Sequence, residues 1–467
     1  MKKLLLYGVS GMAIILLAGC SSDNFSSLSS QTKNIFKNTK VNADNKSTST
    51  TSSVAKPEKL MLNDIAKVAS ASADWTGGFQ KAIKSSVETD PVVLNAKAKY
   101  QAKLGSIDLA KTSREFKFSG SLLTGVEDVT DETAGAVAVI NGRKIMFDGG
   151  KIDSQISREE FLASAALAEY EIRQNERASN ALSVWVNLKR YSTLNELIQS
   201  RLNVLAPLIQ QLEKVAEAGL GDASQVAAAE RTVNMIRVTE KEVAQQLAEA
   251  EVGFESVFGV ESPGIPFEGE MISNAVDLLK VEDLVKTSPG IELNYAQYGA
   301  AVANLNSIIA KYSFDVGFET KIQKPLGGSG YDSDESIGFV ISKTFHDGGS
   351  VEAEKKISEA QVTAAVDLLK LSFREIEKNV KQAETTISAI TQAIELANEN
   401  AKNAKDEINF LRKQLIIGQS TLDNVLSAEA RLYEAESMAI NFVADRYLAE
   451  ITILTLLGEL VTLFDIE

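Results

Sequence analysis

The stretch that decides the fold is YSFDVGFETKIQKPLGGSGYDSDESIGFVISKTFHDGGS, residues 312–350. Its first twelve residues alternate between apolar and polar side chains. Such alternation predicts a β-strand with one apolar and one polar face. The glycine-rich segment 325–334 predicts a turn, and the apolar residues between 337 and 345 predict the returning strand. The stretch therefore predicts a β-hairpin that leads into Asp347-Gly348-Gly349.

The sequence around this hairpin occurs twice in the chain. Phe147-Asp148-Gly149-Gly150 lies 199 residues before Phe345-His346-Asp347-Gly348-Gly349, counted between the two aspartates. The same spacing, with no gap, relates two further pairs of glycines, Gly219 with Gly418 and Gly259 with Gly458. Upstream, Pro91 pairs with Pro289 at a spacing of 198. Self-similar halves predict one structural unit that is built twice.

Each half has the same order of expected elements. A helix precedes the hairpin, which the first half repeats more weakly, and a very long helix follows the Asp-Gly-Gly sequence. The expected ranges are 91–112 and 289–311 for the first helices, and 151–218 and 350–417 for the long ones. At 1.5 Å per residue, each long helix reaches about 100 Å. We expect Pro207 to kink or break the first long helix near its far end.

A glycine-containing tip and a returning helix follow each long helix. In the returning helices, apolar residues recur with a spacing of 3.5, as in Val226, Ala229, Val233 and Ile236 and in Val425, Ala428, Leu432 and Ala435. This heptad pattern predicts antiparallel coiled-coil packing against the long helix.

The hairpins have two possible environments. About ten alternating residues are the length that a tilted strand needs to cross the apolar core of a membrane. Four strands are too few to close a barrel, and open edges would leave backbone groups unpaired in lipid. Strands that face lipid therefore require several chains in one barrel. The alternative is a soluble four-stranded sheet that caps the helices, and alternation alone does not separate the two.

The N-terminus predicts export from the cytoplasm. Lys2 and Lys3 precede an apolar run that ends in Leu17-Ala18-Gly19-Cys20. This arrangement is typical of a secretory signal, and the cysteine matches the lipobox of bacterial lipoproteins. We expect cleavage before Cys20 and acylation of it, which leaves no thiol and changes the net charge from −15 to −17. The alternative is an ordinary signal with a chance cysteine. The polar segment that follows is expected to be a flexible tether.

The composition excludes several classes of function. With a net charge of −15 and no basic patch in the sequence, nucleic acid is not an expected partner. The chain has one histidine, His346, and one cysteine, Cys20. Zinc sites and Ser–His–Asp or Cys–His catalysis need more of these groups. We therefore expect no enzyme, no cofactor and no metal site.

The complete pattern resembles the TolC-like outer-membrane efflux protein family, in a lipoprotein form. The sequences that carry the resemblance are the two Asp-Gly-Gly junctions and the tip LIIGQSTLDNVLSAE, residues 415–429. In this tip Asn424 stands where the family usually has aspartate, and the first tip, 219–226, is more divergent. The resemblance extends from about residue 60 to residue 460.

The resemblance implies a mainly α fold with a small transmembrane β part. Three chains would form a twelve-stranded β-barrel that is continued by a periplasmic α-helical coiled-coil barrel. The implied organisation is a signal peptide (1–19), a lipidated cysteine with a tether (20–59) and two structural repeats (60–267 and 268–467). Residues 260–285, with a short helix at 271–286, would belong to a belt at mid-height.

The implied function is that of an outer-membrane exit duct in a tripartite efflux or type I secretion system. The implied partners are two further copies of the chain, a periplasmic adaptor, an inner-membrane pump (ABC or proton-driven) and outer-membrane lipid. The location would be the outer membrane of a Gram-negative bacterium, with an anchor at Cys20 and an extension into the periplasm. The alternative is a lipid-anchored coiled-coil spacer of the cell envelope without a pore. Sequence does not separate drug efflux from protein secretion.

The resemblance also assigns candidate site residues. Adaptor docking would use the tips, Gly219, Leu220, Gly221 and Asp222 with Gly418, Gln419, Ser420 and Thr421, although these residues also simply close turns. Asp148-Gly149-Gly150 and Asp347-Gly348-Gly349 would form strand-to-helix junctions, where aspartate caps a helix and glycine permits a sharp bend. Asp406 and Glu407 are candidates for an acidic pore constriction, with an ordinary solvated helix face as the alternative.

Overall fold

The computed structural model describes residues 73–74, 76–126, 134–218, 223–262, 264, 266–277, 279–328 and 332–466. The expected signal peptide, Cys20 and the tether lie outside the described residues. So does the first tip, Gly219 to Asp222.

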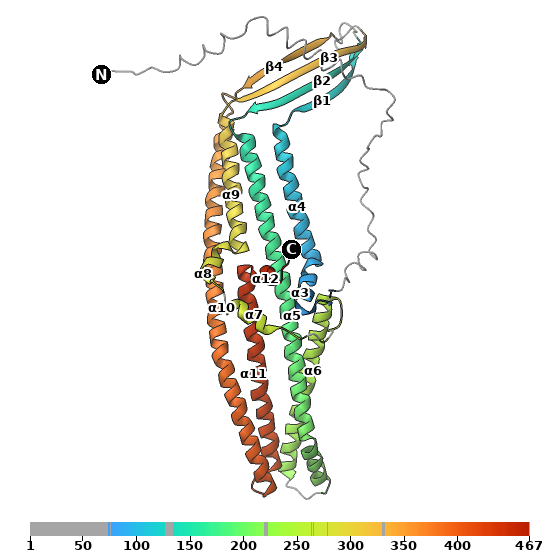
Figure 1. Ribbon diagram of the computed structural model, residues 1–467, viewed down its shortest axis with the longest axis vertical. Coiled ribbons are helices and arrows are strands. Elements are labelled where there is room, and N and C mark those ends of the chain that lie inside the picture. Colours follow the sequence, from blue (N-terminus) through green and yellow to red (C-terminus); the bar gives the residue numbers. More distant parts are fainter. Residues whose placement is uncertain are drawn as a thin grey trace, which may run out of the picture. The chain divides into compact units, whose positions relative to one another are not determined.

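Four antiparallel strands form one sheet in the order β1-β2-β3-β4 (Figure 1). The strands are β1 (Lys117–Val126), β2 (Ala134–Phe147), β3 (Asp315–Gly328) and β4 (Asp334–Ser342). Both predicted hairpins are therefore present, and β2 pairs with β3 to join them. The strands β1 and β4 are the two edges of the sheet.

The predicted limits of β3 were wrong at both ends. The strand begins at Asp315 because residues Ala310–Tyr312 form the 3-10 turn η3. It continues beyond the expected turn, through Pro325 to Gly328. Pro325 pairs with Val137 beside a shift in the register with β2, and such irregularities accommodate a residue that has no N–H to donate.

The two faces of the sheet differ in chemistry. On one face, Arg143 pairs with Glu319 at 3.3 Å and Lys321 pairs with Asp334 at 3.1 Å. On the other face, Phe318 lies opposite Phe339, with ring centroids 5.5 Å apart. The alternation in the sequence is thus expressed as one polar and one apolar face.

The large helices come in pairs of equal length. The helices α4 (Pro91–Lys111) and α9 (Pro289–Ile309) have 21 residues each, and their first residues are 198 positions apart. The helices α5 (Lys151–Glu217) and α10 (Ser350–Ile416) have 67 residues each, 199 positions apart. The helices α6 (Ala223–Phe258) and α11 (Leu422–Leu457) have 36 residues each, again 199 positions apart. Among the described helices, none combines the length and the apolar content that a membrane crossing requires.

The long helices pack as antiparallel pairs, α5 with α6 and α10 with α11 (Figure 1). The predicted heptad residues form their seams. Ala229, Val233 and Ile236 are buried against α5, and Val425, Ala428 and Leu432 are buried against Ile408 of α10. Contacts between α11 and α5 join the two pairs.

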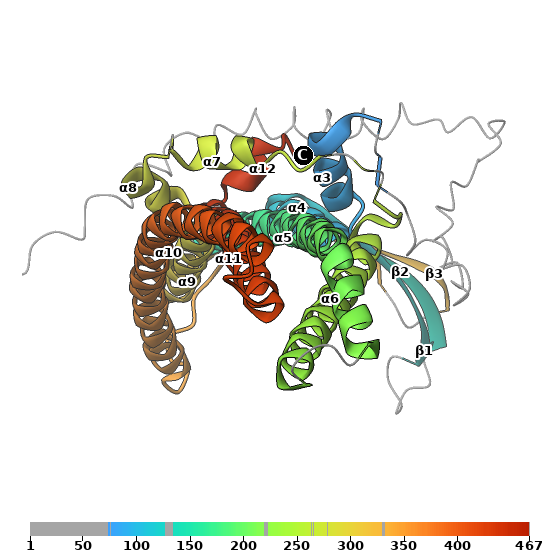
Figure 2. The ribbon, with the colours of Figure 1, turned by 90° about the horizontal axis from the view of Figure 1, so that it is seen from below.

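Short helices lie beside the middle of the long ones. These are α3 (Gly78–Glu88), α7 (Gly269–Asp277), α8 (Val281–Leu284) and α12 (Glu459–Leu463), with the 3-10 turn η2 (Val285–Thr287). Another 3-10 turn, η1 (Thr112–Arg114), joins α4 to β1 next to the sheet. Figure 2 shows α3, α7, α8 and α12 on one side of the long helices. Their core contains Trp185 of α5, whose ring lies 4.7 Å from that of Phe79 and 5.4 Å from that of Phe254. We call these short helices and the described residues of the segment 259–268 the belt.

One helix prediction was wrong, and a second was wrong in one of its alternatives. The single helix expected at 271–286 is divided, because α7 ends at Asp277 and α8 begins at Val281. Of the kink or break expected at Pro207, the break does not occur, since α5 continues to Glu217. Leu208 and Ile209 pack against the core between α5, α6 and α11, and this packing holds the helix together after the proline.

Candidate functional site

The first strand-to-helix junction is built by Asp148. Its carboxylate accepts hydrogen bonds from the N–H of Gly150 at 3.1 Å and from the N–H of Ile152 at 2.6 Å. Gly149 and Gly150 have φ angles of 69° and 89°, which side chains disfavour. A Cβ on Gly149 would lie 2.2 Å from Cβ of Ser313. The aspartate thus caps α5, and the first glycine lets the chain turn close to η3.

The second junction has the same geometry. Asp347 accepts hydrogen bonds from the N–H of Gly349 at 3.0 Å and of Val351 at 2.7 Å. These bonds lower the pKa of Asp347, because they stabilise its ionised form. Gly348 and Gly349 have φ angles of 69° and 85°. The neighbouring His346 is exposed, and among the described residues nothing pairs with it.

The second tip joins α10 to α11. Gly418 has a φ of 73° and donates to the carbonyl of Leu415 at 3.1 Å, and Gln419 donates to that of Gln414 at 2.9 Å. These bonds close α10 through a left-handed glycine. The hydroxyl of Thr421 accepts from the N–H of Asn424 at 3.3 Å and caps α11. At this tip Ile416 and Ile417 are 85% and 66% exposed, an apolar surface that the sequence analysis did not single out.

Asp406 and Glu407 are adjacent in sequence, but they differ in their ion pairs and in the direction of their side chains. Glu407 forms an ion pair with Arg431 of α11 at 2.7 Å. Asp406 is exposed and has no ion pair with any described residue. The next residue, Ile408, is buried against α11, so the three side chains leave α10 in different directions. Asp406 is therefore the less compensated of the two carboxylates.

A buried ionic cluster lies between α5, α10 and α11, and the sequence analysis missed it. Glu429 of α11 is 1% exposed, is paired with Arg412 of α10, and lies 3.8 Å from Arg201 of α5. Arg201 also donates to Glu436, with Nε 3.1 Å from one carboxylate oxygen. One carboxylate oxygen of Glu429 has no hydrogen-bond donor. Glu429 and Glu436 directly follow residues of the heptad seam, and only the tertiary structure brings them together with the two arginines.

A second polar contact ties the belt to α11. Ser273 of α7 donates to the carboxylate of Glu450 at 2.7 Å, and Nε of Arg446 lies 3.1 Å from the same carboxylate. Burial raises the pKa of Glu450, although these partners oppose the shift.

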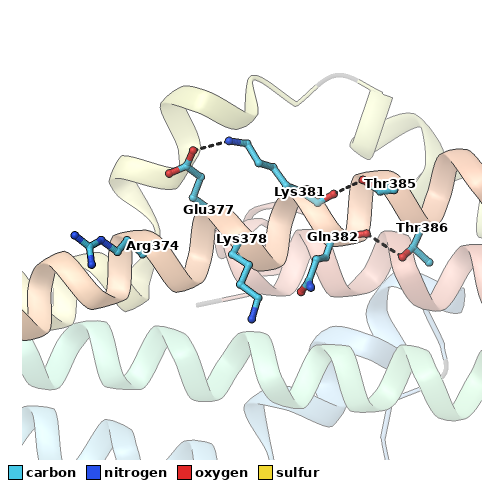
Figure 3. Close-up of a pocket in the computed structure, with 7 residues that line it drawn as sticks. All are labelled: Arg374, Glu377, Lys378, Lys381, Gln382, Thr385 and Thr386. Carbon is cyan, nitrogen blue, oxygen red and sulfur yellow. Dashed lines mark hydrogen bonds and ion pairs between the residues drawn. The ribbon is translucent and has the colours of Figure 1, made fainter.

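One face of α10 lines a wide and open hollow of about 860 Å³. Figure 3 shows its residues, Arg374, Glu377, Lys378, Lys381, Gln382, Thr385 and Thr386, all on this helix. Lys381 pairs with Glu377 at 2.6 Å, while the side chain of Lys378 points away from this pair. Since all these residues belong to one helix, no set of groups converges on a ligand or a reacting atom.

The comparisons with known proteins agree with this architecture. Residues 296–459 match the family model described as outer membrane efflux protein. No curated protein matches the sequence. Among solved structures, the outer membrane protein VceC from Vibrio cholerae is similar with a TM-score of 0.71 and 17% identity, over 81% of this chain and 95% of that one.

Two further solved structures have the same fold. The CmeC outer membrane channel of Campylobacter jejuni has a TM-score of 0.69 and 11% identity, over 83% of this chain and 89% of that one. The MtrE outer membrane channel of Neisseria gonorrhoeae has a TM-score of 0.68 and 14% identity, over 81% of this chain and 88% of that one. At these identities the likeness concerns the fold. The predicted combination of long helices with a small sheet is confirmed.

Proposed function

Because this chain is related to the outer-membrane efflux proteins, by residues 296–459 and by its fold, we propose that it is the exit duct of a tripartite export system. Three copies form a passive channel through the outer membrane and the periplasm. An inner-membrane pump delivers the cargo through a periplasmic adaptor. Efflux and type I secretion use the same architecture, and the pump and adaptor select the cargo.

The observation that carries this proposal is the open sheet above the long helices. A single sheet of four strands has one apolar face, and its edge strands β1 and β4 each have one free edge that no described strand covers. Such edges are stable in a membrane only when another copy pairs with them. Three copies would supply twelve strands, which is enough to close a barrel around a channel.

The helices support the same assembly. Leu396 and Phe410 of α10 are 67% and 61% exposed, and Met235 and Val252 of α6 are 64% and 66% exposed. Exposed apolar residues on two unpaired helix faces favour a helix–helix contact with a neighbouring copy. The face of α10 in Figure 3 lacks a second wall, and we propose that α6 of the next copy provides it.

The equal lengths and constant spacing of the paired helices support an internal duplication, which gives six similar units around the ring. In this ring, the Asp148 and Asp347 junctions connect barrel to tunnel, and the tips at 218–224 and 417–423 face the adaptor. The exposed Ile416 and Ile417 supply apolar area for this contact. Asp406 is the stronger candidate for an acidic lumen residue, because Arg431 compensates Glu407.

The anchor is proposed from the sequence. Acylation of Cys20 would hold the mature N-terminus in the outer membrane, and the polar segment to residue 59 would connect it to the folded part. Mass spectrometry of the mature N-terminal peptide tests this part separately. An unmodified Cys20 would exclude the lipoprotein form and leave the duct unaffected.

Cross-linking of the sheet edges tests the duct. Ser119 of β1 and Ser342 of β4 are exposed, belong to the same polar face, and lie near the helical ends of their strands. The double variant Ser119→Cys with Ser342→Cys should give covalent trimers with a bifunctional thiol reagent in outer membranes. Each single variant should give none. Products that continue beyond the trimer, or no product from a folded protein, would contradict a closed barrel of three copies.

A further inference from the structure

A separate hollow of about 380 Å³ lies between the two helical pairs, beside the belt. Its walls come from α5, α10 and α11, with Phe267 of the belt. The apolar part is formed by Val186, Ile440, Val443, Ala444, Phe267 and Tyr447. The rings of Phe267 and Tyr447 stand edge to face, with centroids 5.2 Å apart. A volume and lining of this kind are typical of small-molecule sites.

Two positively charged side chains of α5, Lys189 and Arg190, line this hollow. Lys189 is exposed and has no ion pair with a described residue. Arg190 has a side chain that is only 13% exposed, and one end of its guanidinium is paired with Asp445. Its Nε is buried and has no hydrogen-bond acceptor. The wall therefore has one more positive than negative charge, together with an unused buried donor, in a chain whose net charge is −15.

From this combination we infer that the hollow is a binding site for a small amphiphilic carboxylate. The aryl or alkyl part of the ligand lies against Val186, Ile440 and Val443. Its carboxylate pairs with the ammonium of Lys189, beside the guanidinium of Arg190. The charge-assisted contact with Lys189 is stronger than a contact between neutral groups.

The position of the hollow determines which helices a bound ligand contacts. The hollow has α5 on one side and α11 on the other, so an occupant contacts both pairs at once. A ligand that fills it resists relative movement of the two pairs, because it binds only one of their arrangements. This inference concerns binding alone and does not depend on export by the assembled protein.

The test is calorimetric titration of the full-length, detergent-solubilised protein with 4-phenylbutyrate, and with the neutral 4-phenylbutanol as the matched ligand. The carboxylate should bind at least about tenfold more tightly than the alcohol, since a charge-assisted hydrogen bond contributes this much. Lys189→Gln should weaken carboxylate binding by about tenfold and leave alcohol binding unchanged. Val443→Trp should abolish binding of both ligands by filling the hollow.

The control variant is Lys405→Gln, which removes an exposed cation of α10 outside this hollow. It should bind like the wild type. Circular dichroism and thermal melting establish that each variant is folded. Absence of carboxylate binding to the folded wild type would overturn the inference, as would equal binding of acid and alcohol. Binding that survives Val443→Trp would place the ligand elsewhere on the protein.

Discussion

Replacement of Glu429 by glutamine is expected to loosen the helical pairs near their tips. The substitution preserves the size of the side chain, so it creates no cavity, and it removes the negative charge between Arg412 and Arg201. The amide presents a donor to two guanidinium groups that are themselves only donors. The effect should therefore arise from the ionic cluster and not from lost packing.

The size of the expected free-energy loss follows from the burial of Glu429, whose side chain is 1% exposed. Removing one partner of a buried ion pair costs about 3–5 kcal/mol. Here two features reduce the loss, because Arg201 keeps Glu436 and the side chain of Arg412 is 40% exposed and can be hydrated. We expect about 3 kcal/mol, the lower end of that range, which corresponds to about hundredfold faster opening.

Native-state hydrogen exchange measures this opening without assuming that the whole assembly unfolds in one step. Exchange in 405–435 and 195–210 should accelerate about a hundredfold, and exchange in the sheet should not change. The matched control is Glu230→Gln, the position 199 residues earlier, where the side chain is exposed and has no ion pair among the described residues. If both variants exchange alike, within about 0.5 kcal/mol, the cluster does not stabilise the tips and the reasoning is wrong.

Three further predictions concern the junctions, the belt and the helix faces. Asp347→Ala removes the cap of α10 and should cost about 1 kcal/mol in chemical unfolding, while Asp347→Asn should restore most of it. At the belt, the pKa of Glu450 is raised above its ordinary value of 4.5. Between that value and the raised pKa, the native state binds more protons than the unfolded chain. The free energy of unfolding should therefore fall as the pH rises through this range. Glu450→Gln should reduce this slope in thermal melts recorded between pH 4.5 and 7, and an unchanged slope would assign it to another group, such as Glu171, whose pKa burial also raises. On the exposed face of α10, Leu396→Asp should weaken the trimer in analytical ultracentrifugation, whereas Leu396→Met should not.

Much of the fold follows from local patterns in the sequence. The alternating residues of 315–322 determine a strand with two different faces, because the side-chain period of a strand is two. The spacing of 199 between Asp148 and Asp347 recurs in the starts of α5 and α10, since the same cap begins each helix. The heptads of 226–236 and 425–435 indicate which residues are buried in the two pairs.

Other features depend on contacts that a local pattern does not contain. Arg201 and Glu436 are 235 residues apart in sequence, and only the packing of α5 on α11 makes them partners. Pro207 was expected to kink or break a helix by its missing N–H, yet the helix is not broken, because the packing of Leu208 and Ile209 outweighs that single lost bond. For the same reason, the pairing of Glu407 with Arg431 distinguishes it from Asp406, although the two residues are adjacent in sequence.

The central claim is that this chain forms a duct, and single-channel current through the purified trimer in a planar bilayer tests it most directly. We expect stable steps that favour cations, because the chain has a net charge of −15 and Asp406 has no ion pair with any described residue. Asp406→Asn should change the conductance or its sensitivity to multivalent cations, and Lys405→Gln should not. Silence from folded trimers of the wild type and of Asp406→Asn alike would contradict the duct and leave an envelope spacer in its place.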